Sequence, residues 1–148
     1  MIIRSAVDAD LPAVAAAYAW LFEPPGGMPP TWNESGATAA LRDVLAAERS
    51  DVLVAVDDGD TLAGFCTVYL DIVSVRFGQR CWIEDLAVHP DRRAQRVGAR
   101  LMDAASDWAK DHGASHVELD SGDARLRAHR FYERREPAWT SRCFGWVL

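Results

Sequence analysis

The segment Trp82-Ile-Glu-Asp-Leu-Ala-Val-His-Pro-Asp-Arg-Arg-Ala-Gln-Arg-Val-Gly98 joins three kinds of local structure. Its first part is apolar and strand-like, Pro90 ends that strand, and a loop rich in hydrogen-bond donors follows. From about Arg96 the apolar residues recur at helical spacing as far as Asp111. Amides in the first turn of a helix lack internal partners and lie at the positive end of its dipole, so they bind phosphate. The segment therefore predicts an anion site at a strand–loop–helix junction.

Arginines are concentrated in two parts of an otherwise acidic chain. The 148 residues carry 22 acidic and 16 basic side chains, which gives a net charge of −6. This balance argues against nucleic-acid binding, which needs a basic face, and suits a cationic substrate. Residues 92–100 and 125–135 nevertheless contain nine arginines. We expect at least one of these clusters to hold an anion.

Length and composition indicate one soluble domain, because 148 residues can bury a core and 49% of them are hydrophobic. No apolar run approaches the roughly 20 residues of a membrane helix, and the N-terminus does not resemble a secretory signal. The cysteines have no metal-ligand spacing, so Cys66, Cys81 and Cys143 are expected as buried core residues. Trp108 and Trp146 are also expected in the core. We therefore expect a cytoplasmic protein with no metal and no membrane partner.

The remaining pattern predicts alternating strands and helices. Strands are expected at residues 2–6, 52–56, 62–70, 81–89 and 116–119, with two more between 137 and 148. Helices are expected from Asp8 or Asp10 to about residue 22, and at residues 35–48, 96–111 and 124–134. The proline- and glycine-rich stretch 23–30 predicts a loop that shapes a pocket mouth. This order predicts an α/β fold with a mixed central sheet of about seven strands and four helices.

The loop and helix start resemble a motif of the GNAT acetyltransferases. Their motif A reads Arg/Gln-x-x-Gly-x-Gly/Ala after a strand that ends in Val-x-Pro, and this chain has Arg93-Ala-Gln-Arg-Val-Gly98. Arg96 replaces the middle glycine. Because the loop runs directly into a helix, we expect arginine to be accommodated there without a positive φ.

A second segment, Ala128-His-Arg-Phe-Tyr-Glu-Arg134, resembles motif B of the same family. Arg125 stands at the asparagine position of that motif, and Glu136-Pro137 replaces the usual Gly-Phe. The two motifs occur in the family's order and cover roughly residues 80–135. The resemblance implies a GNAT-like three-layer fold with splayed central strands, in a single domain covering residues 1–148.

The resemblance implies acetyl-CoA as the acyl-donor cosubstrate. Its pyrophosphate would lie on the loop and the helix start, and its pantetheine arm would run along strand 82–88. An N–H of that strand would polarise the thioester carbonyl. The residues so implied are Leu86, Ala87, Val88, Arg93, Ala94, Gln95, Arg96, Val97, Gly98, Ala99, Arg125 and Ala128.

Direct attack by an amine needs one group to accept the ammonium proton and another to protonate the leaving thiolate. Tyr132 matches the family's tyrosine general acid. Glu84 and Asp85 need an explanation, because charges are rare within an apolar strand. They would face opposite sides of a regular strand, unless a bulge re-aims them. We expect Glu84 as base or amine anchor, and Asp85, Trp32 and Asp120 as substrate contacts.

Several alternatives remain open. The acceptor is expected to be the primary amine of a small cationic molecule, but a protein lysine or N-terminus is a second candidate. A non-catalytic CoA-sensing module with the same fold is a third. Glu84 and Asp85 could instead be solvated or paired with arginines such as Arg80 or Arg125. By resemblance, a homodimer through terminal strands is one expected assembly.

Overall fold

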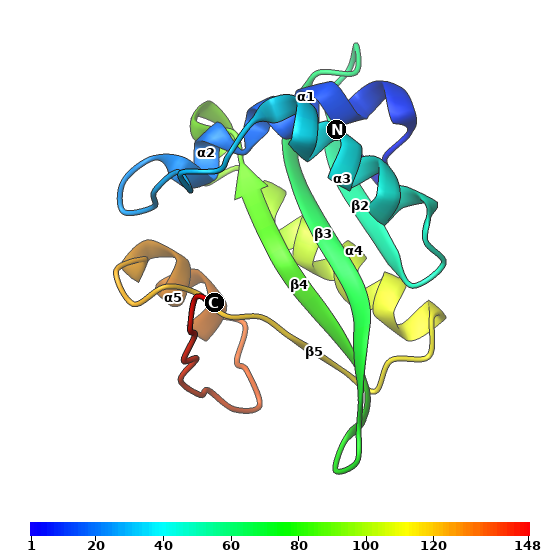
Figure 1. Cartoon of the computed structure of the whole chain (residues 1–148), viewed down its shortest axis with the longest axis vertical. Coiled ribbons are helices and arrows are strands. Elements are labelled where there is room, and N and C mark those ends of the chain that lie inside the picture. The colour runs from blue at the N-terminus through cyan, green and yellow to red at the C-terminus, as the bar shows by residue number, and fades with distance from the viewer.

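The fold is a five-stranded sheet between helical layers, described for residues 1–148 by a computed structural model (Figure 1). The strands follow one another across the sheet in chain order. Neighbouring strands are antiparallel except for the last pair, which is parallel. The strands are β1 (Ile2–Ser5), β2 (Ser50–Val56), β3 (Leu62–Ser74), β4 (Gly78–Val88) and β5 (His116–Glu118).

Helices cover both faces of this sheet. α1 (Leu11–Ala17) and α3 (Glu34–Ala46) pack on one face, and α4 (Val97–Asp111) packs on the other. α2 (Ala19–Phe22) continues from α1 toward the end of β4, and α5 (Leu126–Glu133) follows β5 (Figure 1). Short 3₁₀ turns at Asp8–Asp10 and Pro90–Arg92 precede α1 and α4.

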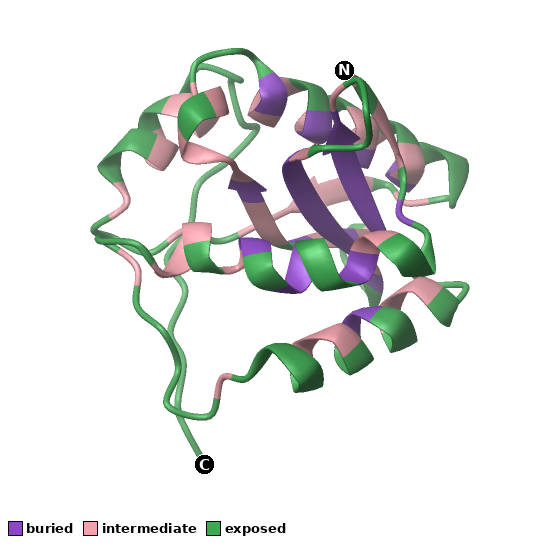
Figure 2. Cartoon of the chain, turned by 90° about the horizontal axis from the view of Figure 1, so that it is seen from above, coloured by how far each residue is buried: buried purple, intermediate pink, exposed green.

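Two apolar clusters hold these layers together, one on each face of the sheet. Alternate residues of a strand face opposite sides, so one run of apolar residues serves both clusters. Figure 2 shows that burial is concentrated in the central strands and on the helix faces turned toward them. The α4 side contains Leu53, Ala55, Cys66, Val68, Ile83, Leu101 and Ala105, among others. The α1 and α3 side contains Leu11, Val14, Leu41, Val52, Val54, Val56 and Phe65, among others.

A glycine sets how closely α4 approaches the sheet. A Cβ atom at Gly64 of β3 would lie 2.8 Å from the Ala87 carbonyl oxygen and 3.0 Å from Leu101 Cδ1. Both distances are shorter than normal packing allows, and the carbonyl belongs to backbone that has little freedom to move. Gly64 therefore holds the first turns of α4 against the end of β4.

β4 contains a β-bulge opposite Thr67. The register with β3 skips one residue there, so Thr67 alone faces both Glu84 and Asp85. Ile83 before the bulge and Leu86 after it both pack on the α4 side. The extra residue thus leaves the side chains of Glu84 and Asp85 together on the opposite face, toward α1.

The expected α/β class and mixed sheet are confirmed, but the sheet has five strands where about seven were expected. The expected first helix is divided at Tyr18 into α1 and α2, so there are five α-helices in place of four. None of the helices combines the length and the apolar character that crossing a membrane requires.

The expected closing strands between residues 137 and 148 are wrong, because that segment contains neither strand nor helix. β5 pairs over only three residues, so it offers too short an edge for further strands to extend. Trp146 is 83% exposed and the Cys143 thiol is also exposed, against the expectation that both lie in the core. The core placement is confirmed for Cys66 and Cys81.

We predict that Gly64→Ala destabilises the protein, because the added methyl group overlaps the Ala87 carbonyl. Overpacking of this kind costs about 1–3 kcal/mol, and each kcal/mol lowers the melting temperature by about 2–4 °C in a domain of this size. Thermal unfolding followed by circular dichroism measures the change. Gly27→Ala is the control, since a Cβ at Gly27 has no atom within 4 Å. Equal melting temperatures for the two variants would contradict the close packing.

Candidate active site

β4 and β5 lie side by side over only three residue pairs, from Arg80–His116 to Trp82–Glu118. Beyond Trp82, β4 continues to Val88 with no strand on that side, while the chain after β5 turns away toward α5 (Figure 1). The expected splay of central strands is therefore present. The N–H and C=O groups on an unpaired strand edge are available to an extended ligand.

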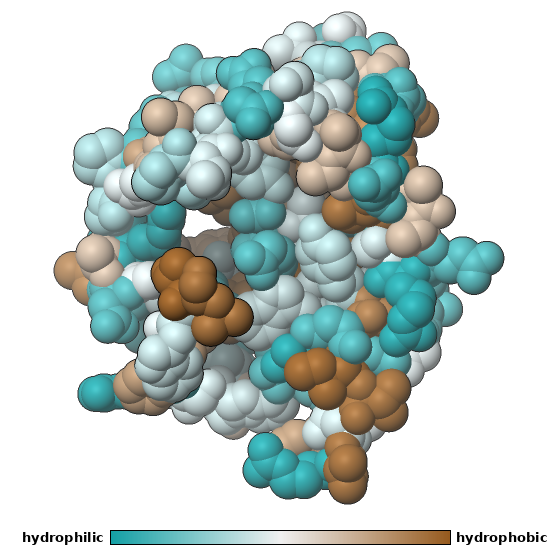
Figure 3. Space-filling model, in the orientation of Figure 1, coloured by the Kyte–Doolittle hydropathy of each residue, from teal (hydrophilic) through white to brown (hydrophobic).

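A cleft of about 890 Å³ lies beside this open edge. Its walls are the end of β4, the start of α4, α5 and the segment from Trp20 to Pro25. Figure 3 shows that the surface is hollowed between α5 and the part of the chain that contains α2. This volume is within the range of small-molecule and cofactor sites. The cleft is lined by these expected cofactor residues: Leu86, Ala87, Val88, Arg93, Ala94, Arg96, Val97, Gly98, Ala99, Arg125 and Ala128.

The cleft is strongly basic although the protein is acidic. Its lining contains seven arginines and a single acidic residue, Glu23, in a chain whose net charge is −6. Both arginine clusters of the sequence contribute, because α5 faces the start of α4 across the cleft. The arginines are Arg92, Arg93, Arg96, Arg125, Arg127, Arg134 and Arg135.

Four of these arginines are engaged within the protein and three are not. Arg93 lies 3.3 Å from the carboxylate of Glu23, while Arg92 pairs with Asp57 and Arg135 with Asp103. Arg125 donates a hydrogen bond to a backbone carbonyl. The three that form neither an ion pair nor a side-chain hydrogen bond within the protein are Arg96, Arg127 and Arg134. A multiply charged anion such as a phosphate ester suits this surplus of guanidinium groups.

The start of α4 provides free amides in the same cleft. The amides of Val97, Gly98 and Ala99 have no acceptor in the protein, and no side chain caps the helix. Arg96, which precedes the helix, has φ 64° and ψ 9°, and Ala94 has φ 67°. Left-handed residues beside helical ones turn successive N–H groups toward a common point, which favours an anion there.

The expectation that Arg96 would need no positive φ is therefore wrong. The motif position that is usually glycine keeps its left-handed conformation in this chain, although the residue is arginine. A non-glycine residue in this conformation costs about 1–2 kcal/mol. Strain of this size is tolerated where the surrounding structure fixes the turn, and it occurs frequently at functional sites.

Gly98 leaves open space in the cleft. A Cβ atom at Gly98 would lie 3.6 Å from Val88 Cγ2 and 3.7 Å from Phe131 Cζ, which are ordinary contacts. The packing of α4 therefore does not require glycine here. The missing side chain instead gives a ligand access to the first turn of the helix.

Tyr132 lines the same cleft from α5. Its side chain is half-buried, and burial raises the pKa of the phenol to about 12. The hydroxyl therefore keeps its proton at every pH at which the protein is expected to work. It can donate a hydrogen bond to a negative charge that develops beside it. Phe131, the preceding residue, also lines the cleft, so α5 presents two aromatic rings to it.

Glu84 and Asp85 differ in their surroundings although the bulge puts them on one face. Glu84 is exposed and accepts a hydrogen bond from Trp82 Nε1 at 2.6 Å. Asp85 is half-buried and accepts hydrogen bonds from the hydroxyls of Tyr18 at 2.6 Å and Thr67 at 3.2 Å. Burial raises the pKa of Asp85, and the neighbouring Glu84 raises it further.

Neither acid is paired with an arginine. Arg80 binds Asp71 at 2.7 Å and Glu118 at 3.3 Å. Arg125 donates to the backbone carbonyl of Leu21 at 2.9 Å. The alternative in which these two arginines neutralise the acids is therefore wrong.

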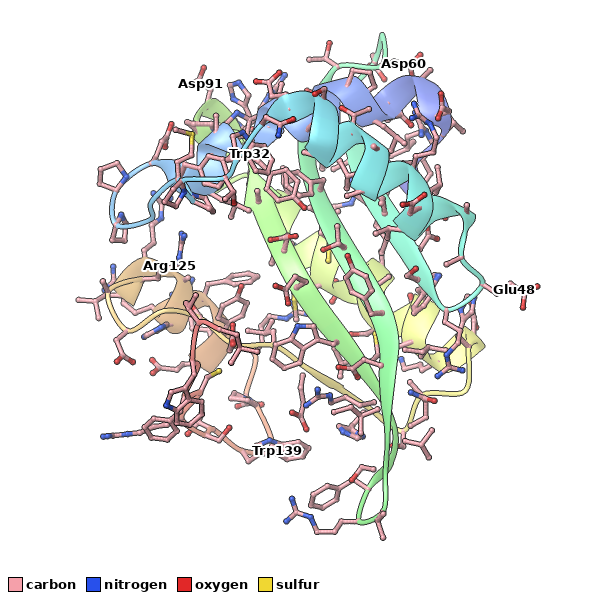
Figure 4. All side chains as sticks on the ribbon, viewed as in Figure 1. Trp32, Glu48, Asp60, Asp91, Arg125 and Trp139 are labelled. Atoms are coloured by element: carbon pink, nitrogen blue, oxygen red, sulfur yellow. The ribbon has the colours of Figure 1, made fainter.

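Glu84 and Asp85 do not line the cleft, and the remaining expected site residues also lie outside it. Gln95 turns back and donates to the Asp91 carbonyl at 3.0 Å. Trp32 packs in an aromatic group beside the upper end of β4 (Figure 4). Asp120 is exposed after β5, where its carboxylate raises the pKa of the Cys143 thiol.

The segment from Trp20 to Pro25 is the main part of the cleft that sequence reasoning did not assign to the cofactor. Arg125 links it to α5 through the hydrogen bond to Leu21, and the side chain extends from α5 toward this segment in Figure 4. The proline-rich stretch did indicate a pocket mouth. That α5 lies across the cleft from this stretch could not be predicted from the sequence. The additional lining residues are Trp20, Leu21, Glu23, Pro24, Pro25, Arg92, Ala124, Leu126, Arg127, Phe131, Arg134 and Arg135.

Comparison with known proteins identifies the family. The acetyltransferase (GNAT) family matches residues 14–136, and the chain belongs to this family. The uncharacterized N-acetyltransferase YhdJ of Bacillus subtilis is 38% identical over 90 residues, which are 61% of this chain and 63% of that protein. Streptothricin acetyltransferase of Streptomyces lavendulae is 35% identical over 85 residues, 57% of this chain and 43% of that protein. The matches thus span less than two thirds of these relatives.

A solved structure shows the same fold over nearly the whole chain. The aminoglycoside N-acetyltransferase AAC(6')-Iy, in complex with CoA, superposes with a TM-score of 0.83. The comparison covers 99% of this chain and 93% of that one, at 18% sequence identity. At this identity the likeness concerns the fold.

We predict that Arg96→Gly is more stable than Arg96→Ala by about 1 kcal/mol, because glycine adopts the left-handed conformation without strain. Both variants lose the guanidinium, so both should bind coenzyme A about tenfold more weakly than the wild type. Thermal unfolding measures the first difference and titration calorimetry the second. Equal stability of the two variants would show that the turn is not strained.

Proposed function

We propose that this protein transfers an acetyl group from acetyl-CoA to the primary amine of a small cationic molecule, by direct attack in a ternary complex. The observation that carries the proposal is an arginine-lined cleft beside the unpaired edge of β4, with Tyr132 in its wall. Membership of the acetyltransferase (GNAT) family supports the same reaction.

The cleft residues fit coenzyme A. Its phosphates would lie against the free amides of Val97, Gly98 and Ala99 and against the unpaired arginines. Its pantetheine amides would hydrogen-bond to the open backbone edge of residues 86–88. An N–H of that edge would polarise the thioester carbonyl and stabilise the oxyanion that forms.

The reaction requires two proton transfers. The neutral amine attacks the thioester carbonyl carbon, the new C–N bond forms, and the C–S bond breaks as the thiolate leaves. Glu84 is proposed to accept the ammonium proton, directly or through water, because it is exposed and lies on the face where the acceptor would approach. Tyr132 is proposed to donate a hydrogen bond, and finally a proton, to the thiolate. Asp85, Trp32 and Asp120 are proposed as contacts of the acceptor.

The names of two similar proteins favour a small amine as the acceptor. One is a streptothricin acetyltransferase and the other an aminoglycoside N-acetyltransferase. Trp32 also lies beside the upper end of β4 (Figure 4), where a protein acceptor would need an open groove.

We predict that Tyr132→Phe lowers kcat about a hundredfold and leaves coenzyme A affinity nearly unchanged, because only the hydroxyl is lost. Release of free thiol from acetyl-CoA with a panel of amines measures the rate. Because the pKa of Tyr132 is raised to about 12, wild-type kcat should not fall between pH 8 and about pH 10 through loss of this proton.

The same panel distinguishes the alternative functions. Wild-type protein that binds coenzyme A but releases thiol with no amine would contradict the proposed reaction and favour a CoA-sensing module. Turnover of lysine-containing peptides but of no small amine would favour protein acetylation.

A further inference from the structure

Asp85 is an acidic side chain that no cation of the protein pairs with. Both of its hydrogen bonds from hydroxyls end on Oδ2, and Oδ1 accepts none. No lysine, arginine or histidine forms an ion pair with it, and the charged group beside it is another acid, Glu84. A half-buried carboxylate without a cation is costly, so such groups are normally paired.

Two hydroxyl groups fix the orientation of this carboxylate. Tyr18 reaches it from the end of α1, and the fully buried Thr67 reaches it from β3. The Asp85 amide also donates to Thr67 Oγ1 at 3.0 Å, where the bulge has displaced the ladder. Burial and the charge of Asp85 raise the pKa of Tyr18, so its phenol stays a donor. The network holds Oδ2 and leaves Oδ1 free for a ligand.

Aromatic rings pack against the ring of Tyr18, the residue whose hydroxyl holds Asp85. The ring of Tyr18 lies 5.0 Å from that of Trp32 and 4.9 Å from that of Phe65, and Phe22 lies 4.8 Å from Trp32. Tyr18, Phe22 and Trp32 are only partly buried. Ring faces attract organic cations, and ring surface also favours the apolar carbon that bears an ammonium group.

We propose that Asp85 Oδ1 anchors the ammonium group of the acceptor, with Tyr18 as its positioning residue and Trp32 as an aromatic wall. The inference rests on the proposed acetyl transfer and defines its substrate class. The acceptor is a primary amine on an apolar or neutral carbon skeleton, with no carboxylate or phosphate next to the amine. An anionic group at that position would face Glu84 and Asp85, and no arginine pairs with either acid to offset the repulsion.

The decisive variant is Asp85→Asn. Its side-chain carbonyl can occupy the place of Oδ2 and keep both hydroxyl donors, while its NH₂ group takes the place of Oδ1. The change therefore removes the charge and preserves the network. The matched pair of acceptors is 2-phenylethylamine and phenylalanine, which differ only by the carboxylate beside the amine.

In wild-type protein, kcat/KM should be at least about a hundredfold higher for 2-phenylethylamine than for phenylalanine. In Asp85→Asn, KM for 2-phenylethylamine should rise at least about tenfold. The ratio of kcat/KM for 2-phenylethylamine to kcat/KM for phenylalanine should fall below about ten. The affinity for coenzyme A should stay unchanged. Tyr18→Phe should raise KM by a smaller factor, because the anchor keeps its charge and loses only one donor.

Thermal stability gives a readout that does not depend on turnover. The folded-state pKa of Asp85 is raised, so its charge opposes folding at pH values above that pKa and has no effect below the unfolded value of 3.8. Asp85→Asn should therefore have a higher melting temperature than wild type at pH 7, and this gain should vanish near pH 3.5.

The outcomes separate this inference from the proposed function. An active wild-type enzyme whose KM and preference are unchanged in Asp85→Asn would overturn the anchor and leave the acetyl transfer intact. A lower melting temperature of Asp85→Asn at pH 7 would also overturn it, since Asp85 would then be a structural residue. A wild-type protein that binds coenzyme A and releases thiol with no amine would overturn the proposed function itself.

Discussion

The unpaired edge of β4 beyond Trp82 is the constraint on which the site depends. Backbone N–H and C=O groups inside a protein need partners, and a strand that lacks a neighbour leaves them to a ligand or to water. The edge is held open because β5 pairs for only three residues before the chain turns toward α5. Gly64 then brings the first turn of α4 to the end of the same strand. The cleft, its free amides and its arginines all follow from this arrangement.

The bulge in β4 gives the same strand a second polar surface. Its open edge faces the basic cleft, and its α1-facing surface presents Glu84 and Asp85. An acidic surface suits a cationic acceptor and a basic cleft suits a phosphorylated donor. The one extra residue in β4 therefore gives this strand an acidic pair on its α1-facing surface, while its open edge faces the basic cleft.

The sequence predicted best those parts of the site that depend on residue type and local spacing alone. The strand–loop–helix junction, both arginine clusters and Tyr132 were predicted, and the structure brings them together at one cleft. The bulge could not be predicted, because one inserted residue leaves the apolar pattern of β4 almost unchanged. The left-handed Arg96 is set by the turn around it and not by its own preference. The contact between Arg125 and Leu21 joins residues 104 positions apart, which no local pattern encodes.

The cysteines affect how the chemistry of this protein is followed. Cys66 and Cys81 are buried, and the neighbouring Asp120 carboxylate raises the pKa of the exposed Cys143 thiol. Reagents that detect thiols react with the thiolate, so a raised pKa slows the reaction of Cys143 at neutral pH. In the folded protein only the Cys143 thiol is exposed to a disulfide dye, so the background in an assay of released coenzyme A is at most about one thiol per chain.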